Sequence, residues 1–143
     1  MGIFDILRIS ASGLKAQRTR METIAGNLSN IHTTRTEEGG PYRKKEVVFM
    51  SSDVSEEKSF SGFFSKQIEG VKVSAIEESE KAFEKVFDPN HPDADEEGYV
   101  MFPNVNLMEE MTDMVAATRA YEANINVMDT TKDMLIKSLD LIK

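Results

Sequence analysis

Apolar residues recur at intervals of seven along the first thirty residues of the chain, which is typical of one face of an α-helix. The face comprises Leu7, Leu14, Met21 and Leu28, with Ile3, Ile24 and Ile31 three or four residues from members of that row. Ser10 and Gln17 interrupt the second row, and Gly13 and Gly26 each weaken a helix by about 1 kcal/mol relative to alanine. The pattern predicts an N-terminal helix that ends near Asn30 and needs a partner for stability.

The C-terminal third carries a longer and more regular apolar pattern. One row comprises Leu107, Met114, Tyr121, Met128, Leu135 and Ile142, and a second comprises Met111, Thr118, Ile125 and Leu139. Lys132 is the only charged residue of the second row, and neither Gly nor Pro occurs between Asn104 and Lys143. Asn106 followed by Glu109 resembles a capping box. The sequence therefore predicts one continuous helix from Asn106 to Lys143.

A helix of this length does not fit inside a globule made by one such chain. At 1.5 Å per residue it would extend about 57 Å, whereas a compact chain of this size is only about 37 Å across. An apolar stripe of that length would aggregate if left in water. We therefore expect the two terminal helices to pair as an antiparallel coiled coil and then to pack on other molecules; a simple helix-bundle core without assembly is the alternative.

The residues expected to form the assembly core are apolar members of these helical rows. They are Leu7, Leu14, Met21, Ile24, Leu28, Ile31, Leu107, Met111, Met114, Tyr121, Ile125, Met128, Leu135 and Leu139.

Between the two helical patterns the periodicity changes. Val47–Phe49 reads as a short strand, and Val71, Val73 and Ala75 alternate with polar residues as in a half-buried strand. Residues 51–65 are expected to form a loop, and residues 77–87 fit either a helix or a strand. The fold class is therefore mainly α with a small β insert, divided into an N-terminal helix (1–31), an extended linker with a β-containing insert (32–103) and a C-terminal helix (104–143).

The composition excludes several kinds of chemistry. The 143 residues include no cysteine, no tryptophan and only two histidines, which removes disulfides, thiolate nucleophiles and cysteine-based zinc sites. Seventeen basic and 25 acidic residues give a formal net charge of −8, which would repel a nucleic-acid backbone. The acidic excess lies in the middle of the chain, so we expect a solvated acidic surface there and no nucleic-acid partner.

The sequence also lacks the signals of membrane association. No apolar run approaches the ~18 residues needed to span a bilayer, and the first residues lack the basic flank and apolar core of a Sec signal peptide. Met1-Gly2 would need Ser or Thr at position 6 for myristoylation, but Ile6 stands there. We expect neither a Sec signal nor a lipid anchor.

No candidate catalytic, cofactor or metal site emerges. Residues 93–98 match the opening of an EF-hand loop, but the twelfth position would be Asn104, where a bidentate Glu is required. His32 and His91 are far apart and outside any metal-binding spacing. The basic cluster at residues 43–45 is interpreted as local charge balance against Glu37, Glu38 and Glu46. We therefore expect a protein that is not an enzyme.

Several short motifs resemble the axial proteins of the bacterial flagellar rod and hook. The stretch Ala25-Gly-Asn27-Leu28-Ser-Asn30, followed by Thr33, is similar to their N-terminal signature, although Gly26 and Ser29 depart from it. A more specific likeness, to proximal rod subunits, covers nearly the whole chain except residues 51–70. The signature residues are Asn27, Leu28, Asn30, Thr33, Pro41, Tyr42, Arg43, Asp88, Pro89, His91, Pro92, Gly98, Tyr99, Pro103 and Asn104.

The resemblance implies a structural subunit of the basal-body rod, the drive shaft that crosses the periplasm. It implies export through the flagellar type III apparatus without a Sec signal peptide, and terminal helices that form axial contacts. The implied partners are further copies of the same chain, the rod proteins FlgB, FlgF and FlgG, and FliE at the base. The alternative from another class is a coiled-coil adaptor or export-chaperone-type binding module, which would use the same apolar rows on one partner.

Overall fold

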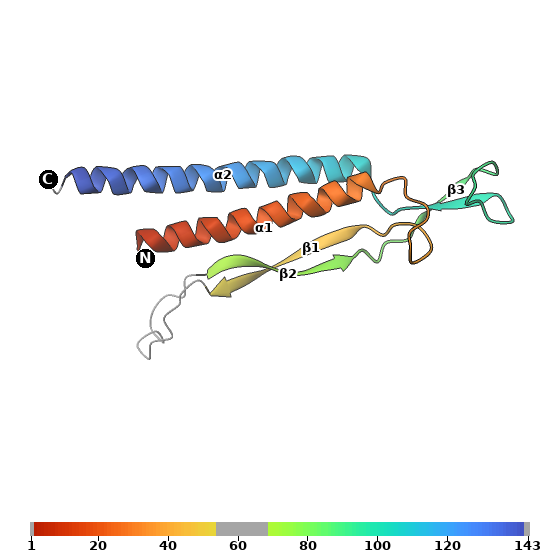
Figure 1. Cartoon of the computed structure of the whole chain (residues 1–143), viewed down its shortest axis with the longest axis horizontal. Helices are drawn as coiled ribbons and strands as arrows, with labels where there is room; N and C mark the ends of the chain where they lie inside the picture. Colours follow the sequence, from red (N-terminus) through yellow and green to blue (C-terminus); the bar gives the residue numbers. More distant parts are fainter. Residues whose placement is uncertain (1, 54–68, 142–143) are drawn as a thin grey trace.

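A computed structural model of the chain describes residues 2–53 and 69–141 as two long helices with four strands between them (Figure 1). The elements in chain order are α1 (Ile3–Ser29), β1 (Lys45–Asp53), β2 (Glu69–Glu78), β3 (Glu84–Phe87), β4 (Tyr99–Phe102) and α2 (Leu107–Asp140). The expected class, mainly α with a small β insert, is confirmed.

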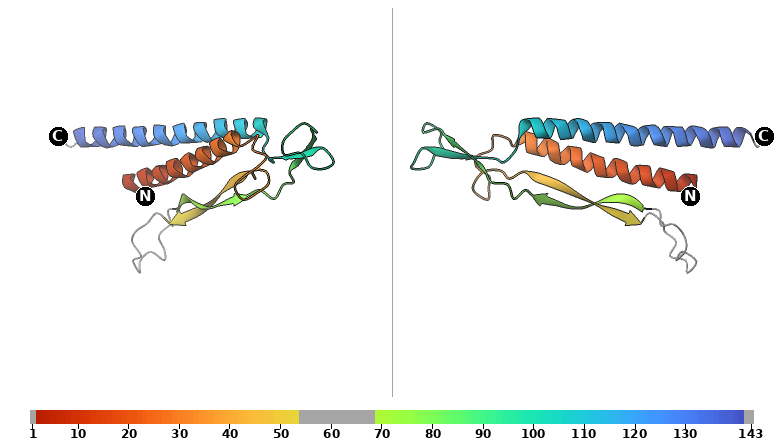
Figure 2. Two further views of the ribbon diagram at one scale, coloured as in Figure 1. Left: turned by 45° about the vertical axis from the view of Figure 1, so that its right-hand side comes forward. Right: turned by 180° about the vertical axis from the view of Figure 1, so that it is seen from behind.

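The two helices lie side by side and run in opposite directions, as Figures 1 and 2 show from several sides. Asn27 near the end of α1 contacts Glu110 near the start of α2, and Gly13 lies against Asn124. Because the helices are antiparallel and Asn27 lies opposite Glu110, Ile3 at the start of α1 lies roughly opposite Met134 of α2. The last turns of α2 therefore extend beyond α1, and the side chains of Leu139 and Leu141 there are 65% and 87% exposed.

Both helices begin and end close to the predicted positions. The Asn106 side chain accepts hydrogen bonds from the backbone N–H groups of Met108 and Glu109, which satisfies donors that have no partner inside the helix. At the end of α1, the Asn30 amide donates to the carbonyl of Gly26. The predicted start of α2 at Asn106 is confirmed. The helix ends at Asp140, and residues 142–143 of the predicted helix lie outside the described residues.

Strands β1 and β2 form an antiparallel pair with a bulge between Val48 and Phe49. The pair packs along α1, where the backbone N–H of Val71 donates to the Ser12 hydroxyl at 3.1 Å. Both predicted strands are confirmed. The prediction of a loop from residue 51 is wrong at its start, because Ser51 pairs with Val71 and β1 continues to Asp53; residues 54–65 of that loop lie outside the described residues.

A second antiparallel pair, β3 with β4, stands at the opposite end of the molecule from the chain termini (Figure 1). The stretch 77–87, which fitted either a helix or a strand, contains the end of β2, an irregular segment and β3. Strand β4 was not predicted, since its four residues are too few to show a period. The connection between β3 and β4 turns at Gly98, whose φ of +80° favours glycine.

The helices approach each other closely at Gly13. A Cβ atom placed there would lie 3.1 Å from the Asn124 amide, whereas a Cβ placed at Gly26 would meet no atom within 4 Å. Both glycines lie inside α1 with helical backbone. Both glycines therefore lower helix propensity. Only at Gly13 does the absence of a side chain leave room for a residue of α2.

We predict opposite outcomes for alanine at these two positions. Gly26→Ala should raise the free energy of unfolding by about 0.5–1 kcal/mol, because it restricts the unfolded chain and meets no atom. Gly13→Ala should give no gain or a loss, because it pushes the Asn124 side chain out of the interface. Urea unfolding followed by circular dichroism compares the variants, and an equal gain for both would contradict the close approach.

Candidate assembly interface

The face that α2 turns toward α1 is narrow and carries small or polar side chains. Glu110, Ala117, Asn124 and Thr131 recur every seven residues along it, and Glu110, Ala117 and Thr131 are 1%, 1% and 5% exposed. Ser10, from the interrupted row of α1, is also buried. The helices thus meet through a row that the apolar pattern did not single out, because small and polar residues allow a close approach that large ones would block.

The predicted assembly-core residues occupy the margins of this contact. Ile24 is buried. Those half-buried are Leu7, Leu14, Met21, Leu28, Ile31, Met114, Tyr121, Met128 and Leu135. Those exposed are Leu107, Met111, Ile125 and Leu139. Four members of the first predicted row of α2 therefore border α1. In the second row Met111, Ile125 and Leu139 are exposed, whereas the Thr118 hydroxyl contacts Met21 of α1. The role of both rows in assembly stays a prediction.

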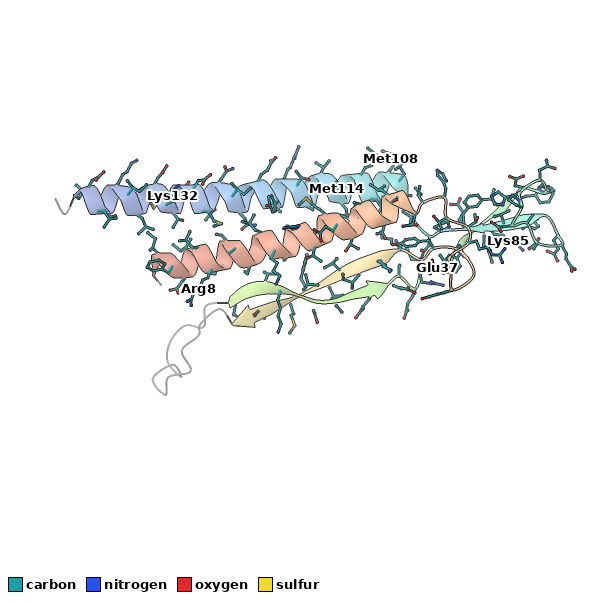
Figure 3. The ribbon with its side chains drawn as sticks, viewed as in Figure 1. Arg8, Glu37, Lys85, Met108, Met114 and Lys132 are labelled. Atoms are coloured by element: carbon teal, nitrogen blue, oxygen red, sulfur yellow. The ribbon has the colours of Figure 1, made fainter. Side chains whose placement is uncertain are left out.

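Helix α2 is covered on one side only. Among the helices and strands of the described chain, α1 alone packs against it. On its free sides, exposed apolar side chains begin at Leu107 and Met108, which are 50% and 70% exposed, and continue through Val115 and Val127 to Met134. Figure 3 shows Met108 on the side of α2 away from α1, and Met114 nearer to α1. A helix with apolar side chains on its free sides is suited to contact other molecules.

A polar cluster joins α1, α2 and the start of β1, and Asn27 is its centre. Its amide donates to the Lys45 carbonyl and to Glu110 Oε2, both at 2.9 Å. Its amide oxygen accepts from the Lys45 backbone N–H at 2.9 Å and from the Tyr42 hydroxyl at 3.0 Å. Asn27 is 1% exposed, so four hydrogen bonds satisfy a buried amide and fix three parts of the chain together. We call Asn27, Tyr42, Lys44, Lys45 and Glu110 the junction cluster.

An ion pair completes the junction cluster. Lys44 Nζ lies 2.7 Å from Glu110 Oε1, and the two side chains are 10% and 1% exposed. Glu46 and Glu109 lie farther from the same ammonium group, at 3.9 Å each. Burial acts to lower the pKa of Lys44, but the hydrogen bond and the charge of Glu110, with the two other carboxylates, outweigh it and raise the pKa above 10.5.

The Tyr42 hydroxyl is affected by the same carboxylate. Burial raises the pKa of Tyr42 above its ordinary value of 10.0, and the negative charges of Glu110 and Glu78 raise it further. The neutral phenol and the charged ammonium are therefore the stable forms in the folded chain.

The signature residues Asn104 and Arg43 extend the junction toward the β strands. The Asn104 side chain accepts from the Lys44 backbone N–H at 2.8 Å and donates to the Lys81 carbonyl at 2.9 Å. The Arg43 guanidinium donates to the Ser79 carbonyl and stacks 4.3 Å from the centre of the Phe83 ring. These side chains hold the segment between β2 and β3 against the linker that leads into β1.

Other signature residues shape the turns on either side of this junction. Thr33 donates through its hydroxyl to Asn30 and accepts the Tyr42 backbone N–H through its carbonyl. In the β3–β4 connection, the Asp88 backbone N–H donates to the Gly98 carbonyl, and the His91 ring packs edge-on to Phe102. Pro103 is buried next to Asn104, and Pro41 is half-buried, while Pro89 and Pro92 are exposed. The signature thus marks backbone geometry rather than a chemical centre.

Sequence reasoning missed the pairing of Lys44 with Glu110. The basic cluster at residues 43–45 was interpreted as local charge balance, and that interpretation is correct only for the distant contact of Lys44 with Glu46. The main partner comes from α2, 66 positions along the chain. One signal pointed to it: Glu110 stands in the same seven-residue row as Ala117 and Thr131, where a surface carboxylate would not be expected.

The described residues offer little for chemistry on a small molecule. A groove of about 350 Å³ lies between α1, β1 and α2, and several of its charged side chains are paired with one another, Arg20 with Asp113 at 2.9 Å and Lys44 with Glu110 at 2.7 Å. Within residues 2–53 and 69–141, no three carboxylate or histidine side chains come together as a metal site. In the same part of the chain, neither helix is long and apolar enough to cross a membrane.

Comparison with known proteins identifies the family to which this chain belongs. A family model described as "Flagella basal body rod protein" matches residues 7–35, and one described as "Flagellar basal body rod FlgEFG protein C-terminal" matches residues 96–141. Over full length, the chain is 45% identical to the flagellar basal-body rod protein FlgC of Bacillus subtilis, with all of both chains covered. The chain belongs to the FlgC family.

More distant FlgC proteins also align end to end. The FlgC of Borreliella burgdorferi is 38% identical over 100% of this chain and 99% of its own, and that of Salmonella typhimurium is 37% identical over 99% and 98%. The chain is therefore a structural subunit of the flagellar basal-body rod and not an enzyme, and the adaptor alternative is not favoured. The two family models cover most of α1 and the β4–α2 segment, and they include Asn27 and Glu110 of the junction cluster.

We predict that the ion pair of this FlgC chain stabilises it asymmetrically. Lys44→Met should lower the free energy of unfolding by about 3–5 kcal/mol, because it leaves the Glu110 carboxylate buried without a cation. Glu110→Gln should cost less, since Lys44 keeps two other carboxylates within 4 Å. The double variant should recover much of the loss. Urea unfolding at pH 7 measures all three, and a loss under about 1 kcal/mol for Lys44→Met would rule out a stabilising pair.

We further predict a loss of stability at alkaline pH. Both raised pKa values belong to groups that the folded chain keeps protonated, so their contribution is complete below the ordinary values of 10.0 and 10.5. It is lost as the pH rises through the folded-state values. The unfolding free energy of the wild type should therefore fall above about pH 10, and that of Lys44→Met/Tyr42→Phe should fall less. Parallel pH profiles would contradict this assignment.

Proposed function

We propose that this FlgC chain is a subunit of the proximal rod and that its two terminal helices, paired as an antiparallel coiled coil, form the inner tube of the rod. The support is the one-sided covering of α2, whose free sides carry exposed apolar residues from Leu107 to Leu141. In a helical array, neighbouring subunits would cover these residues and bury the half-buried row that includes Met114 and Leu135. The regions 1–31 and 104–143 are then axial helices, and 32–103 is an outer insert.

Such a subunit needs two different complementary surfaces. A contact between unlike faces, repeated by rotation and rise, produces a filament rather than a closed pair. The free sides of α2 and the outer face of α1 supply such surfaces on one helix pair. Because torque then passes through packed side chains, the subunit would act as part of a drive shaft and transmit motor rotation for motility.

The same proposal places the chain among defined neighbours. Its partners are other FlgC copies, the rod proteins FlgB, FlgF and FlgG, and FliE, and its site is the part of the basal body that spans the periplasm. A chain without cysteine needs no oxidative step after passing through a narrow channel. This composition suits export by the flagellar type III apparatus without a Sec signal peptide, and neither nucleic acid nor a lipid anchor takes part.

We predict that a charge placed in the half-buried row of α2 blocks rod assembly. Tyr121→Asp and Leu135→Asp should each abolish swimming with normal expression, because the array would bury an unpaired carboxylate. Tyr121→Phe and Leu135→Met keep the same two positions apolar, so they are the matched controls and should swim. Soft-agar motility and immunoblots of purified basal bodies measure the outcome. Normal swimming of both aspartate variants would refute the proposed interface, and wild-type protein found only in a soluble cytoplasmic complex would refute the rod assignment.

A further inference from the structure

The β3–β4 hairpin, residues 84–102, has one face that no other helix or strand of the described chain covers. Alternation along the strands places Lys85, Phe87, Tyr99 and Met101 on this face. Phe87, Tyr99 and Met101 are 62%, 36% and 47% exposed. On the opposite face Val100 is 1% exposed, and Phe102 packs against His91. Val86 on that face is 39% exposed, so the opposite face is partly covered and the aromatic face is the more open of the two.

The open face is internally ordered although it is exposed. The rings of Phe87 and Tyr99 meet edge to face with centres 5.2 Å apart, and Lys85 Nζ lies 4.4 Å from the centre of the Tyr99 ring. Lys85 also lies within 4 Å of Asp95 and Glu97. A two-stranded sheet is at best marginally stable alone in water, so an aromatic face held in place in this way is suited to a further contact.

The charge around this face is strongly one-sided. Residues 84–98 contain six acidic residues and one lysine, a net charge of −5 with histidine neutral. Glu96 and Glu97 at the tip are exposed. A protein partner for an aromatic face rimmed by carboxylates should therefore carry basic side chains beside apolar ones.

The chain itself shows what such a partner surface looks like. Arg8, Lys15 and Arg18 are exposed along one side of α1, and Phe4, on the same side, is 70% exposed. Phe4 and Arg8 lie toward the end of the molecule where the N-terminus is found (Figure 3), whereas Lys15 and Arg18 lie near the middle of α1, where Arg18 also pairs with Glu22 at 2.9 Å. The hairpin stands at the opposite end of the molecule (Figure 1). The acidic aromatic surface of the hairpin and the basic surface of α1 are therefore complementary, and they are separated along the long axis.

We propose that the open face of the β3–β4 hairpin docks on the basic face of the N-terminal helix, the stretch that corresponds to residues 8–18 here, of the next subunit along the rod axis. The partner is an axial subunit that presents lysine or arginine beside apolar residues on an exposed helix face. Phe87 and Met101 supply the apolar contact, and Glu96 and Glu97 face the basic side chains. The contact joins unlike surfaces at opposite ends of subunits, as an open assembly requires, and it rests on the proposed rod function.

Site-specific photocrosslinking in assembled basal bodies tests this contact. A benzophenone side chain at Phe87 keeps an aromatic ring at an exposed position, and the same probe at Glu37, in the linker, is the control. We expect the Phe87 probe to crosslink to the N-terminal helix of a neighbouring rod subunit, mapped by mass spectrometry to a segment with Lys or Arg. Crosslinks only within the same chain, or only to a ring or membrane protein, would overturn the proposal.

Charge reversal gives an independent measurement. Glu96→Lys/Glu97→Lys should reduce the number of completed rods at least tenfold, whereas Glu37→Lys/Glu38→Lys, with the same change in net charge at exposed linker positions, should leave it near wild type. Equal effects of the two pairs would overturn the proposal. Wild-type protein present in basal bodies together with a crosslink elsewhere would refute this contact alone. Absence of the wild-type protein from basal bodies would refute the proposed function as well.

Discussion

The structure depends on one buried amide and the charges beside it. Asn27 bonds to the backbone of the linker through Lys45, to Tyr42 and to Glu110 of α2, so a single side chain sets the position of both helices and of the β insert. Because Asn27 and Glu110 are each 1% exposed, loss of any partner would leave a polar group unsatisfied away from water. Polar contacts at the junction cluster thus fix the relative positions of the helices and the β insert, which a large apolar core would otherwise fix.

That arrangement explains why the apolar residues of the helices are largely at the margins. The contact between α1 and α2 uses glycine, alanine, serine and threonine, which allow a close approach but bury little apolar surface. Large side chains such as Tyr121 and Leu135 border the contact, and Met111 and Ile125 lie outside it. The single chain therefore leaves much of the apolar surface of its helices uncovered.

Sequence reasoning found the helices and their ends because periodicity and caps are local signals. Seven-residue spacing identified α1 and α2, and Asn106 marked the start of α2. It did not find β4, whose four residues show no period, or the Lys44–Glu110 pair, whose partners are far apart in the chain. It also did not single out the row from Glu110 to Thr131, most of whose members are buried in the contact with α1, because it ranked large apolar residues above small and polar ones. The signature residues pointed to the junction, but only the fold shows that Asn27, Tyr42, Arg43 and Asn104 act together there.

The unequal lengths of the two helices have a mechanical consequence. Since α2 continues past Ile3 of α1 by about 10 Å, each subunit ends in a step rather than a flat surface. If such units stack end on end, the projecting part of α2 lies beside the neighbouring unit. A bending load is then resisted by sideways contact along this overlap as well as by compression at the ends. A shaft made of such units can stay straight while it rotates, without covalent links between them.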